Sequence, residues 1–533
     1  MTTPKIPAAP ALPTVAGSTA SVGPIVETTS GPVRGAGDGH VHWWKGIPYA
    51  APPIGDLRWR APQPASSWTA VRDASRFGAA PVQTTGPAVR LPDDVERSED
   101  CLTLNVWAAD SVAPGDDRPV VVWIHGGAYV FGSTSQRLYD GRTLTASGEI
   151  VLVTVGYRLG TLGFLDLSRF GDEGEFEPNV ALKDVVAALE WVRANIRGFG
   201  GDPEAVTLAG ESAGAGIVTT LMASPAARGL FHRAIAESSP ATSVYDQDRA
   251  ERVTRHVLDE LGVAPADAAA LRRMPADTLA AAGMTVYSQT PVSDPGTLAF
   301  TPVVDGDLVP EHPVDVFVRG GAHPVPLLIG TNHDETSLFT RMKSPLMPVS
   351  PEALAQMTAA LRAERTDIPD IPTDAEIQVA YAGLAPARRG PAISRDLGFR
   401  MPTLWLVEGH AAVAPTYLYR FDWATPMLHL LRIGATHATE LPYLWGNMVG
   451  GRRDITFLLG GLHTGRLLGA RMQARWIAFA TGAAPDAGEA DAAWPAYDPD
   501  SRATLVIDHT DRLEPDLDAP LREAWGDTPL SFS

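Results

Sequence analysis

The chain has 533 residues, 45% of them hydrophobic and 20% charged, as in an ordinary globular protein. Its formal net charge of −19 argues against a nucleic-acid-binding protein, because neutralising phosphates requires clustered Lys and Arg. The sequence contains no run of 18 apolar residues, so we expect no membrane span. The single cysteine, Cys101, excludes an intrachain disulfide, and residues 1–24 lack a secretory pattern. Both features favour a cytoplasmic protein.

Strands and helices alternate along most of the chain. Residues 1–24 are predicted to form a flexible tail, followed by a short strand within 25–35 and a Pro- and Gly-rich loop at 46–64. Further strands are predicted at 102–107, 120–125, 150–155, 205–209, 231–237, 325–330 and 416–421, and helical stretches at 184–196, 217–222, 249–283 and 350–396. This alternation predicts an α/β fold in which helices cover both faces of a mostly parallel sheet, within a single domain over residues 25–533.

A serine flanked by glycines follows the predicted strand 205–209. The segment Gly210-Glu211-Ser212-Ala213-Gly214 stands where a buried strand ends and a helix should begin. Small neighbours permit the sharp turn that lifts a serine hydroxyl above the edge of a sheet. The N-terminus of the next helix adds N–H groups and a dipole that stabilise negative charge. A plain Gly-rich turn is the alternative for so short a motif, but its position favours Ser212 as a nucleophile.

A serine nucleophile requires further groups. Its hydroxyl reacts only when a base removes the proton, and an acid must orient that base. On a sheet of this kind the chain order is Ser, acid, His, but several His fit this order, so it does not choose among them. Attack on a carbonyl also creates an oxyanion, and the segment His125-Gly126-Gly127-Ala128 follows a buried strand with N–H groups free to bind it. The N–H of Ala213 is a third candidate donor.

Three long motifs resemble the type-B carboxylesterases, which include cholinesterases and bacterial para-nitrobenzyl esterases. They are residues 199–203 (FGGDP) followed by VTLAGESAG, residues 99–106 (EDCLTLNV), and residues 46–59 (GIPYAAPPIGDLRW). The resemblance extends from about Val26 to the end of the chain. It implies the α/β-hydrolase fold, with helical and loop insertions that form a cleft, and hydrolysis of carboxylic esters.

The resemblance also selects the remaining site residues. The segment 332–335 (NHDE) resembles the family's triad acid region, and 434–437 (GATH) resembles the region of its triad histidine, so Glu335 and His437 take these roles. It implies that Gly127, Ala128 and Ala213 bind the oxyanion. It further implies that Glu211 and Glu440 are buried carboxylates behind the site and that Arg58 and Glu99 form a structural ion pair.

Three positions near the site, and the missing disulfide partner of Cys101, depart from the family pattern. Thr336 replaces the Gly that usually follows the acid, Ala438 replaces the Gly that often follows the histidine, and Ala128 replaces a third Gly. These changes bear on the shape of the acyl pocket and leave every reacting group in place. The usual disulfide partner of Cys101 falls near residues 80–81, which are Ala and Pro here, so Cys101 is expected to be a free, buried thiol.

Other polar and aromatic residues have simpler interpretations. His333 is expected at the cleft edge or in solvent, and His125 is expected to pack or hydrogen-bond rather than to bind a ligand. Trp43, Trp44 and Trp59 are predicted to be core or gorge-wall residues. No spacing of His, Asp or Glu resembles a zinc site, so we predict no metal and no cofactor.

The substrate is predicted to be a small-molecule ester with a hydrophobic or aromatic group, bound in an apolar gorge. Residues 284–300 and 338–400 are expected to form its walls as loops, because Pro291, Pro295, Pro345 and Pro348 interrupt them. Carbamates or amides remain alternative substrates for the same triad, and a non-catalytic binding protein is a remote alternative. A monomer or homodimer is expected, without nucleic-acid or membrane partners.

Overall fold

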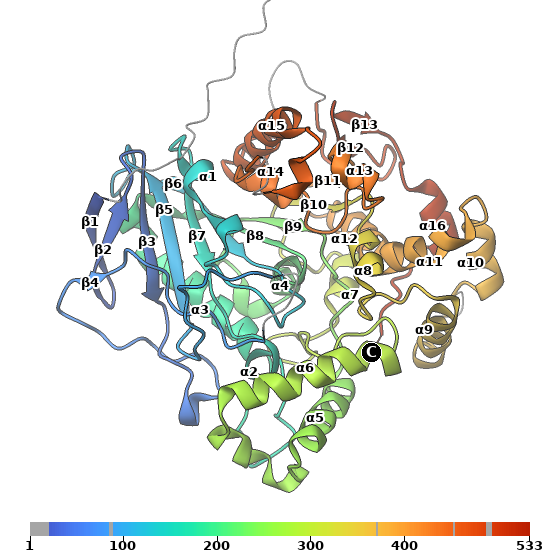
Figure 1. The fold of residues 1–533 in the computed structure, drawn as a ribbon, viewed down its shortest axis with the longest axis horizontal. Helices are drawn as coiled ribbons and strands as arrows, with labels where there is room; N and C mark the ends of the chain where they lie inside the picture. The colour runs from blue at the N-terminus through green and yellow to red at the C-terminus, as the bar shows by residue number, and fades with distance from the viewer. Residues whose placement is uncertain (1–20, 85–88, 369–370, 451–453, 487–492, 533) are drawn as a thin grey trace, which may run out of the picture.

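The computed structural model describes residues 21–84, 89–368, 371–450, 454–486 and 493–532. Within them one 13-stranded sheet has the order β1-β2-β3-β5-β7-β6-β8-β9-β10-β11-β12-β13, with β4 paired to β2 (Figure 1). The strands are β1 (Ser21–Thr28), β2 (Gly31–Gly37), β3 (Val41–Pro48), β4 (Arg72–Asp73), β5 (Thr103–Ala109), β6 (Arg118–Ile124), β7 (Val151–Val155), β8 (Gly201–Glu211), β9 (Arg233–Glu237), β10 (Leu327–Asn332), β11 (Thr416–Phe421), β12 (Thr504–Ile507) and β13 (Arg512–Glu514).

The centre of the sheet is parallel. Neighbouring strands from β7 through β6, β8, β9, β10 and β11 to β12 all pair in parallel, whereas β1, β2, β3 and β5 at one edge and β13 at the other pair antiparallel. Every residue of β7 is buried, as expected for a β-branched strand covered on both faces. The parallel arrangement brings the carboxyl ends of β6, β8, β9 and β10 to the same edge.

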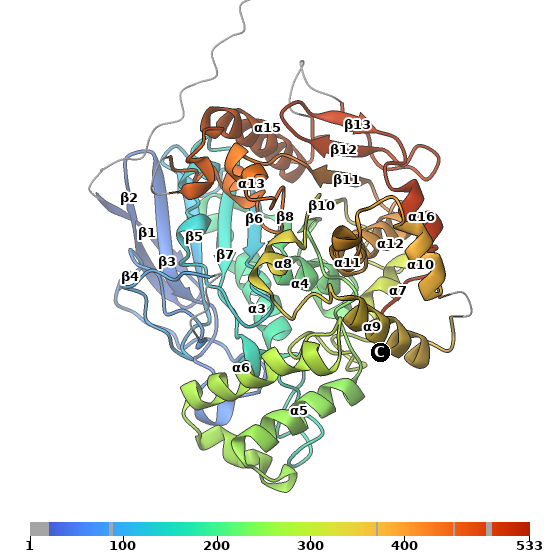
Figure 2. The same cartoon turned by 45° about the vertical axis from the view of Figure 1, so that its right-hand side comes forward.

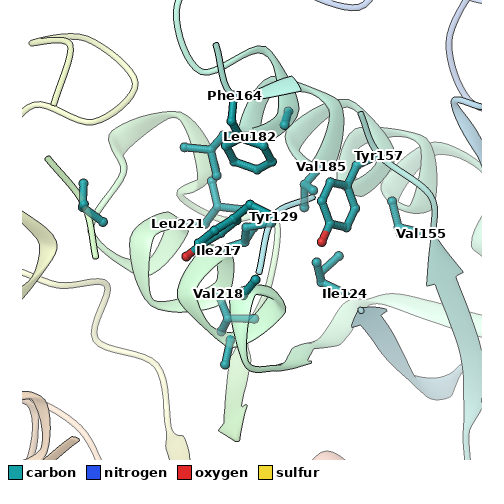
Figure 3. Packing of buried hydrophobic residues seen from close by; sticks show 14 of the residues in the cluster. Ile124, Tyr129, Val155, Tyr157, Phe164, Leu182, Val185, Ile217, Val218 and Leu221 are labelled. Atoms are coloured by element: carbon teal, nitrogen blue, oxygen red, sulfur yellow. The ribbon is translucent and has the colours of Figure 1, made fainter. Parts of the chain in front are cut away.

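Helices pack on both faces of the sheet. In β6, Val122 and Ile124 join one hydrophobic core with residues of α3 (Val180–Asn195) and α4 (Ala213–Met222). Trp123 points the other way and joins a second core with α14 (Leu441–Trp445) and α15 (Leu462–Ala480). Figure 3 shows the first core, where side chains of α4 and of residues 124–185 interdigitate. The predicted mostly parallel sheet with helices on both faces is confirmed.

The first strands differ from the prediction. A single strand was expected within 25–35, but β1 and β2 form an antiparallel hairpin that turns at residues 29–30. Residues 21–24 belong to β1, and the carbonyl of Pro24 accepts a hydrogen bond from the Trp44 indole at 3.1 Å. The predicted tail therefore does not include these four residues, and residues 1–20 lie outside the described part. The single-domain assignment stays a prediction.

The two insertions contain more helix than the prediction of loop walls allows, whereas the helical stretch predicted at 350–396 is confirmed and residues 294–300 and 343–350 lie outside helices. Residues 284–293 continue α6, and most of 338–400 lies in helices. Several prolines there, such as Pro351 and Pro386, occupy first-turn positions, where a missing N–H is tolerated. The α-helices not yet given are α1 (Arg142–Thr145), α2 (Gly160–Gly163), α5 (Gln247–Leu261), α6 (Ala276–Ser293), α7 (Pro313–Val318), α8 (Ser337–Met342), α9 (Pro351–Glu364), α10 (Asp374–Ala380), α11 (Pro386–Arg395), α12 (Met401–His410), α13 (Pro426–Leu430) and α16 (Ala519–Trp525).

Across the described ranges, every helix is too short or too polar to cross a bilayer.

Candidate active site

Ser212 occupies the turn between β8 and α4. Its backbone has φ 55° and ψ −126°, a conformation that residues other than glycine rarely adopt and that the surrounding packing must enforce. A Cβ on Gly214 would lie 2.1 Å from the carbonyl oxygen of Ile124, and one on Gly210 would lie 2.6 Å from the backbone of Gly214. Both glycines are therefore required by close packing of β6, β8 and α4 around the turn.

Three polar side chains that are distant in sequence meet at this turn. The Oγ of Ser212 lies 2.8 Å from Nε2 of His437, and Nδ1 of His437 lies 2.7 Å from Oε2 of Glu335. The N–H of Ser212 donates to the carbonyl of Glu237 at 2.9 Å, which fixes the turn to the end of β9. A chain of hydrogen bonds from hydroxyl to imidazole to carboxylate is the arrangement that activates a serine.

Glu335 is fully buried just beyond β10. Its Oε1 accepts hydrogen bonds from the hydroxyl of Ser238 at 2.6 Å and from the N–H of Asn332 at 2.7 Å, which leaves Oε2 to face His437. The carboxylate is thus held by three donors. The sequence interpretation missed Ser238, although it follows directly on the predicted strand 231–237, which is a signal for a residue at this edge of the sheet.

His437 lies in the loop between α13 and α14. Its ring lies between Phe339 and Phe399, with ring centroids 5.5 and 4.8 Å away. Ala438 has φ +64°, in the left-handed region that favours glycine, so the Ala found here costs some strain. Thr336 has φ −90°, so no glycine is needed there, and its hydroxyl donates to the carbonyl of Pro391 at 2.7 Å.

The segment after β6 presents unpaired N–H groups. Gly127, Ala128 and Tyr129 have φ of +124°, +51° and +63°, a run of left-handed residues that turns amides toward one side. Within the described residues, no acceptor pairs with the N–H of Gly127, Ala128 or Ala213. Ala128 and Ala213 also line the pocket beside Ser212. These three amides can bind a developing oxyanion.

Three further carboxyl groups are buried near Ser212, His437 and Glu335. An Oε1 of Glu211 lies 3.2 Å from Nε2 of His437, Glu440 accepts a hydrogen bond from the Asn332 amide, and Glu237 accepts one from the Trp476 indole at 2.7 Å. The sequence interpretation missed Glu237. Burial raises the pKa of Glu211, Glu237 and Glu440, and repulsion from neighbouring carboxylates adds to it.

The imidazole of His437 is protonated more easily than a free imidazole. Burial lowers the pKa of His437, but the carboxylates of Glu211 and Glu335 outweigh it, and the pKa rises from 6.5 to about 9. When Glu211 is protonated, it lacks the negative charge that raises the pKa of His437. The protonation of the buried carboxyls therefore sets how readily His437 accepts a proton.

An apolar pocket opens over Ser212. Both insertions contribute to it, as predicted, and so do residues 530–532, which the sequence interpretation missed. No Lys, Arg, Asp or Glu occurs among the described residues that line it. These residues are Ala128, Tyr129, Ser212, Ala213, Pro240, Thr242, Ser243, Gly296, Leu298, Phe339, Leu346, Met347, Pro348, Met357, Leu361, Ser394, Leu397, Gly398, Phe399, His437, Leu530, Ser531 and Phe532.

Other predicted residues lie away from this pocket. His125 is buried against Tyr157, with ring centroids 4.6 Å apart, and burial lowers its pKa to about 4, so it is a packing residue. His333 is partly exposed, and its Nδ1 lies 3.1 Å from Oδ2 of Asp334 rather than near Ser212. The three tryptophans predicted to be core or gorge-wall residues are core residues: Trp43, Trp44 and Trp59.

The predicted ion pair and the free thiol are confirmed. Arg58 donates two hydrogen bonds of 2.6 Å to the carboxylate of Glu99. Cys101 is buried and unpaired, and burial raises the pKa of its thiol. Within the described ranges, no group of three or more His, Cys, Asp or Glu side chains is placed to hold a metal ion.

The family model described as the carboxylesterase family matches residues 22–523. The chain belongs to the carboxylesterase family. This carboxylesterase is 36% identical to the para-nitrobenzyl esterase of Bacillus subtilis (strain 168) over 510 residues. The matched region covers 94% of this chain and 98% of the relative. It is 34% identical to the phenmedipham hydrolase of Pseudarthrobacter oxydans, over 91% of this chain and 95% of that protein.

Solved structures agree with this assignment. A PNB esterase structure superposes with a TM-score of 0.79 at 35% identity and covers 94% of this carboxylesterase and 99% of that chain. The predicted α/β-hydrolase fold is therefore confirmed. The carboxylesterase is a serine hydrolase that cleaves carboxylic esters, and its substrates are small-molecule esters.

Proposed function

We propose that Ser212, His437 and Glu335 are the catalytic triad of this carboxylesterase, and that Gly127, Ala128 and Ala213 form its oxyanion hole. The observation that carries the proposal is the continuous pair of short contacts, 2.8 Å from Ser212 to His437 and 2.7 Å from His437 to Glu335. The contacts lie at the base of an apolar pocket, where water competes weakly with a bound ester.

The reaction then proceeds through an acyl-enzyme. Oγ of Ser212 attacks the ester carbonyl carbon while Nε2 of His437 takes the hydroxyl proton, and Glu335 stabilises the imidazolium. The carbonyl oxygen becomes an oxyanion held by the three backbone amides. Collapse of the intermediate breaks the bond to the alcohol oxygen, which leaves with the proton from His437. A water molecule, deprotonated by the same histidine, attacks the acyl-enzyme and releases the acid and free Ser212.

The pocket favours uncharged esters with an apolar group. Leucine, methionine and phenylalanine side chains dominate its lining, and burying a charged group against them would cost far more than it gains. Methionines such as Met347 and Met357 adapt their shape, so related hydrophobic esters can bind. Esters are favoured over carbamates and amides because the para-nitrobenzyl esterase and the PNB esterase structure are named esterases, and rates on matched ester, carbamate and anilide substrates separate these classes.

The test is hydrolysis of short-chain para-nitrophenyl esters by the purified protein. We expect a burst of one nitrophenol per chain before steady turnover, and a loss of 10⁴–10⁶ in kcat in Ser212→Ala. Ser288→Ala is the matched control, because Ser288 is exposed on α6 and bonds only to its own helix. Wild-type-like turnover in Ser212→Ala would remove Ser212 from the mechanism, and an inert but folded wild type would favour a binding role.

A further inference from the structure

The last described residues of the chain form part of the active-site pocket. Leu530, Ser531 and Phe532 are all buried, and all three line the same pocket as Ser212 and His437. They follow α16 and an exposed stretch at 526–528, so the chain returns from the surface to reach the pocket. In Figures 1 and 2 the end of the described chain lies beside α9, away from the central helix α4.

The segment Leu530–Phe532 is held in place from outside the pocket. The guanidinium of Arg365, just after α9, donates to the carbonyl of Ser531 at 3.2 Å and to its hydroxyl at 3.0 Å. The guanidinium of Arg249 on α5 lies over the ring of Phe532, 5.1 Å from its centroid. Neither arginine lines the pocket, so the segment presents its apolar side chains inward and its polar contacts outward.

Residues from two other chain segments pack against Phe532 at the same side of the pocket. A Cβ on Gly296 would lie 2.6 Å from Sδ of Met357 and 3.4 Å from the ring of Phe532, which shows that these three residues pack together. Met357 and Leu361 of α9 continue the wall. Thus Gly296, residues of α9 and the segment Leu530–Phe532 form one apolar wall.

We propose that the segment Leu530–Phe532 is a specificity wall, which limits the length of the apolar group of an uncharged ester bound at Ser212. This inference rests on the proposed function and adds its substrate class. An ester whose acyl or alcohol group ends before Phe532 fills the pocket, and a longer one meets the phenyl ring. Space for one more methylene in such a pocket changes selectivity by about tenfold or more.

The test compares two series of esters, para-nitrophenyl esters of increasing acyl length and acetate esters of increasing alcohol length. Phe532→Ala is expected to raise kcat/KM for the longest esters of one series at least tenfold relative to the shortest ester of the same series. Phe532→Trp should shift the same ratio in the opposite direction, because the indole fills more of the pocket. Thr528→Ala, at an exposed position of the same stretch, is the matched control and should leave the ratio unchanged.

Two further measurements keep the result interpretable. Arg365→Ala removes the hydrogen bonds to Ser531 without touching the pocket and should relax the length limit in the same direction as Phe532→Ala, whereas Asp367→Asn, which alters only the other partner of Arg365, should not. Binding of the longest ester to Ser212→Ala, with and without Phe532→Ala, is measured by calorimetry and should tighten at least tenfold when the ring is removed.

The outcomes separate the two proposals. An unchanged length dependence in Phe532→Ala, Phe532→Trp and Arg365→Ala overturns the wall and leaves the triad intact. A wild type that hydrolyses no ester refutes the proposed function, and the binding measurement then decides whether the segment still limits what enters the pocket.

Discussion

Replacing Glu335 by Gln tests how the buried acid acts. The two side chains have the same shape, but the amide has one acceptor and one donor end. Two donors, the hydroxyl of Ser238 at 2.6 Å and the N–H of Asn332 at 2.7 Å, face one end of the side chain, so the amide oxygen will turn toward them. The NH₂ group then faces Nδ1 of His437 and donates to it.

This reversal has a definite cost. Nδ1 of His437 becomes an acceptor, so the imidazole proton moves to Nε2, the atom that must take the proton of Ser212. The imidazolium formed during attack also loses its counter-charge 2.7 Å away. The equivalent substitution in a serine protease triad lowers kcat by about 10⁴, and we expect a similar loss here, about 5.4 kcal/mol of transition-state stabilisation.

The assay is single-turnover acylation by para-nitrophenyl acetate. It is measured for Glu335→Gln and for Glu335→Asp, which keeps an acceptor and a charge but is shorter by one methylene. Asp should retain far more activity than Gln, and both should unfold at nearly the wild-type temperature. Acylation by Glu335→Gln within tenfold of wild type would refute the argument, because it would show that neither the tautomer nor the charge of the base depends on Glu335.

Two further predictions concern the groups next to Ser212. Because the pKa of His437 is raised above 6.5, kcat/KM should still be rising with pH above neutrality, and Glu211→Gln should move this limb toward lower pH; a wild-type limb at or below 6.5 contradicts the reasoning. Gly214→Ala places a methyl 2.1 Å from the Ile124 carbonyl and should destabilise folding by about 3 kcal/mol and slow ester hydrolysis at least 100-fold, as measured by urea unfolding and initial rates.

The sequence predicts the central sheet well because its strands are nearly continuous apolar runs. Segments such as 120–125 and 150–155 need burial on both faces, and only a sheet covered by helices provides it. The insertions were predicted less well. Pro291 indicated a loop but lies inside α6, whereas Pro295, Pro345 and Pro348 lie outside helices, as predicted.

The predicted site residues were identified from strand ends and from a family resemblance, and both can be recognised in short stretches of sequence. Ser238 was within reach of the same reasoning, because it follows a strand that pairs with β8. Glu237 and the segment Leu530–Phe532 were not. The carboxyl of Glu237 accepts a hydrogen bond from Trp476 of α15, and Leu530–Phe532 contacts Arg365 and Arg249, which lie far away in sequence. Contacts between segments hundreds of residues apart leave no periodic pattern, so the residues that set selectivity are harder to predict than those that react.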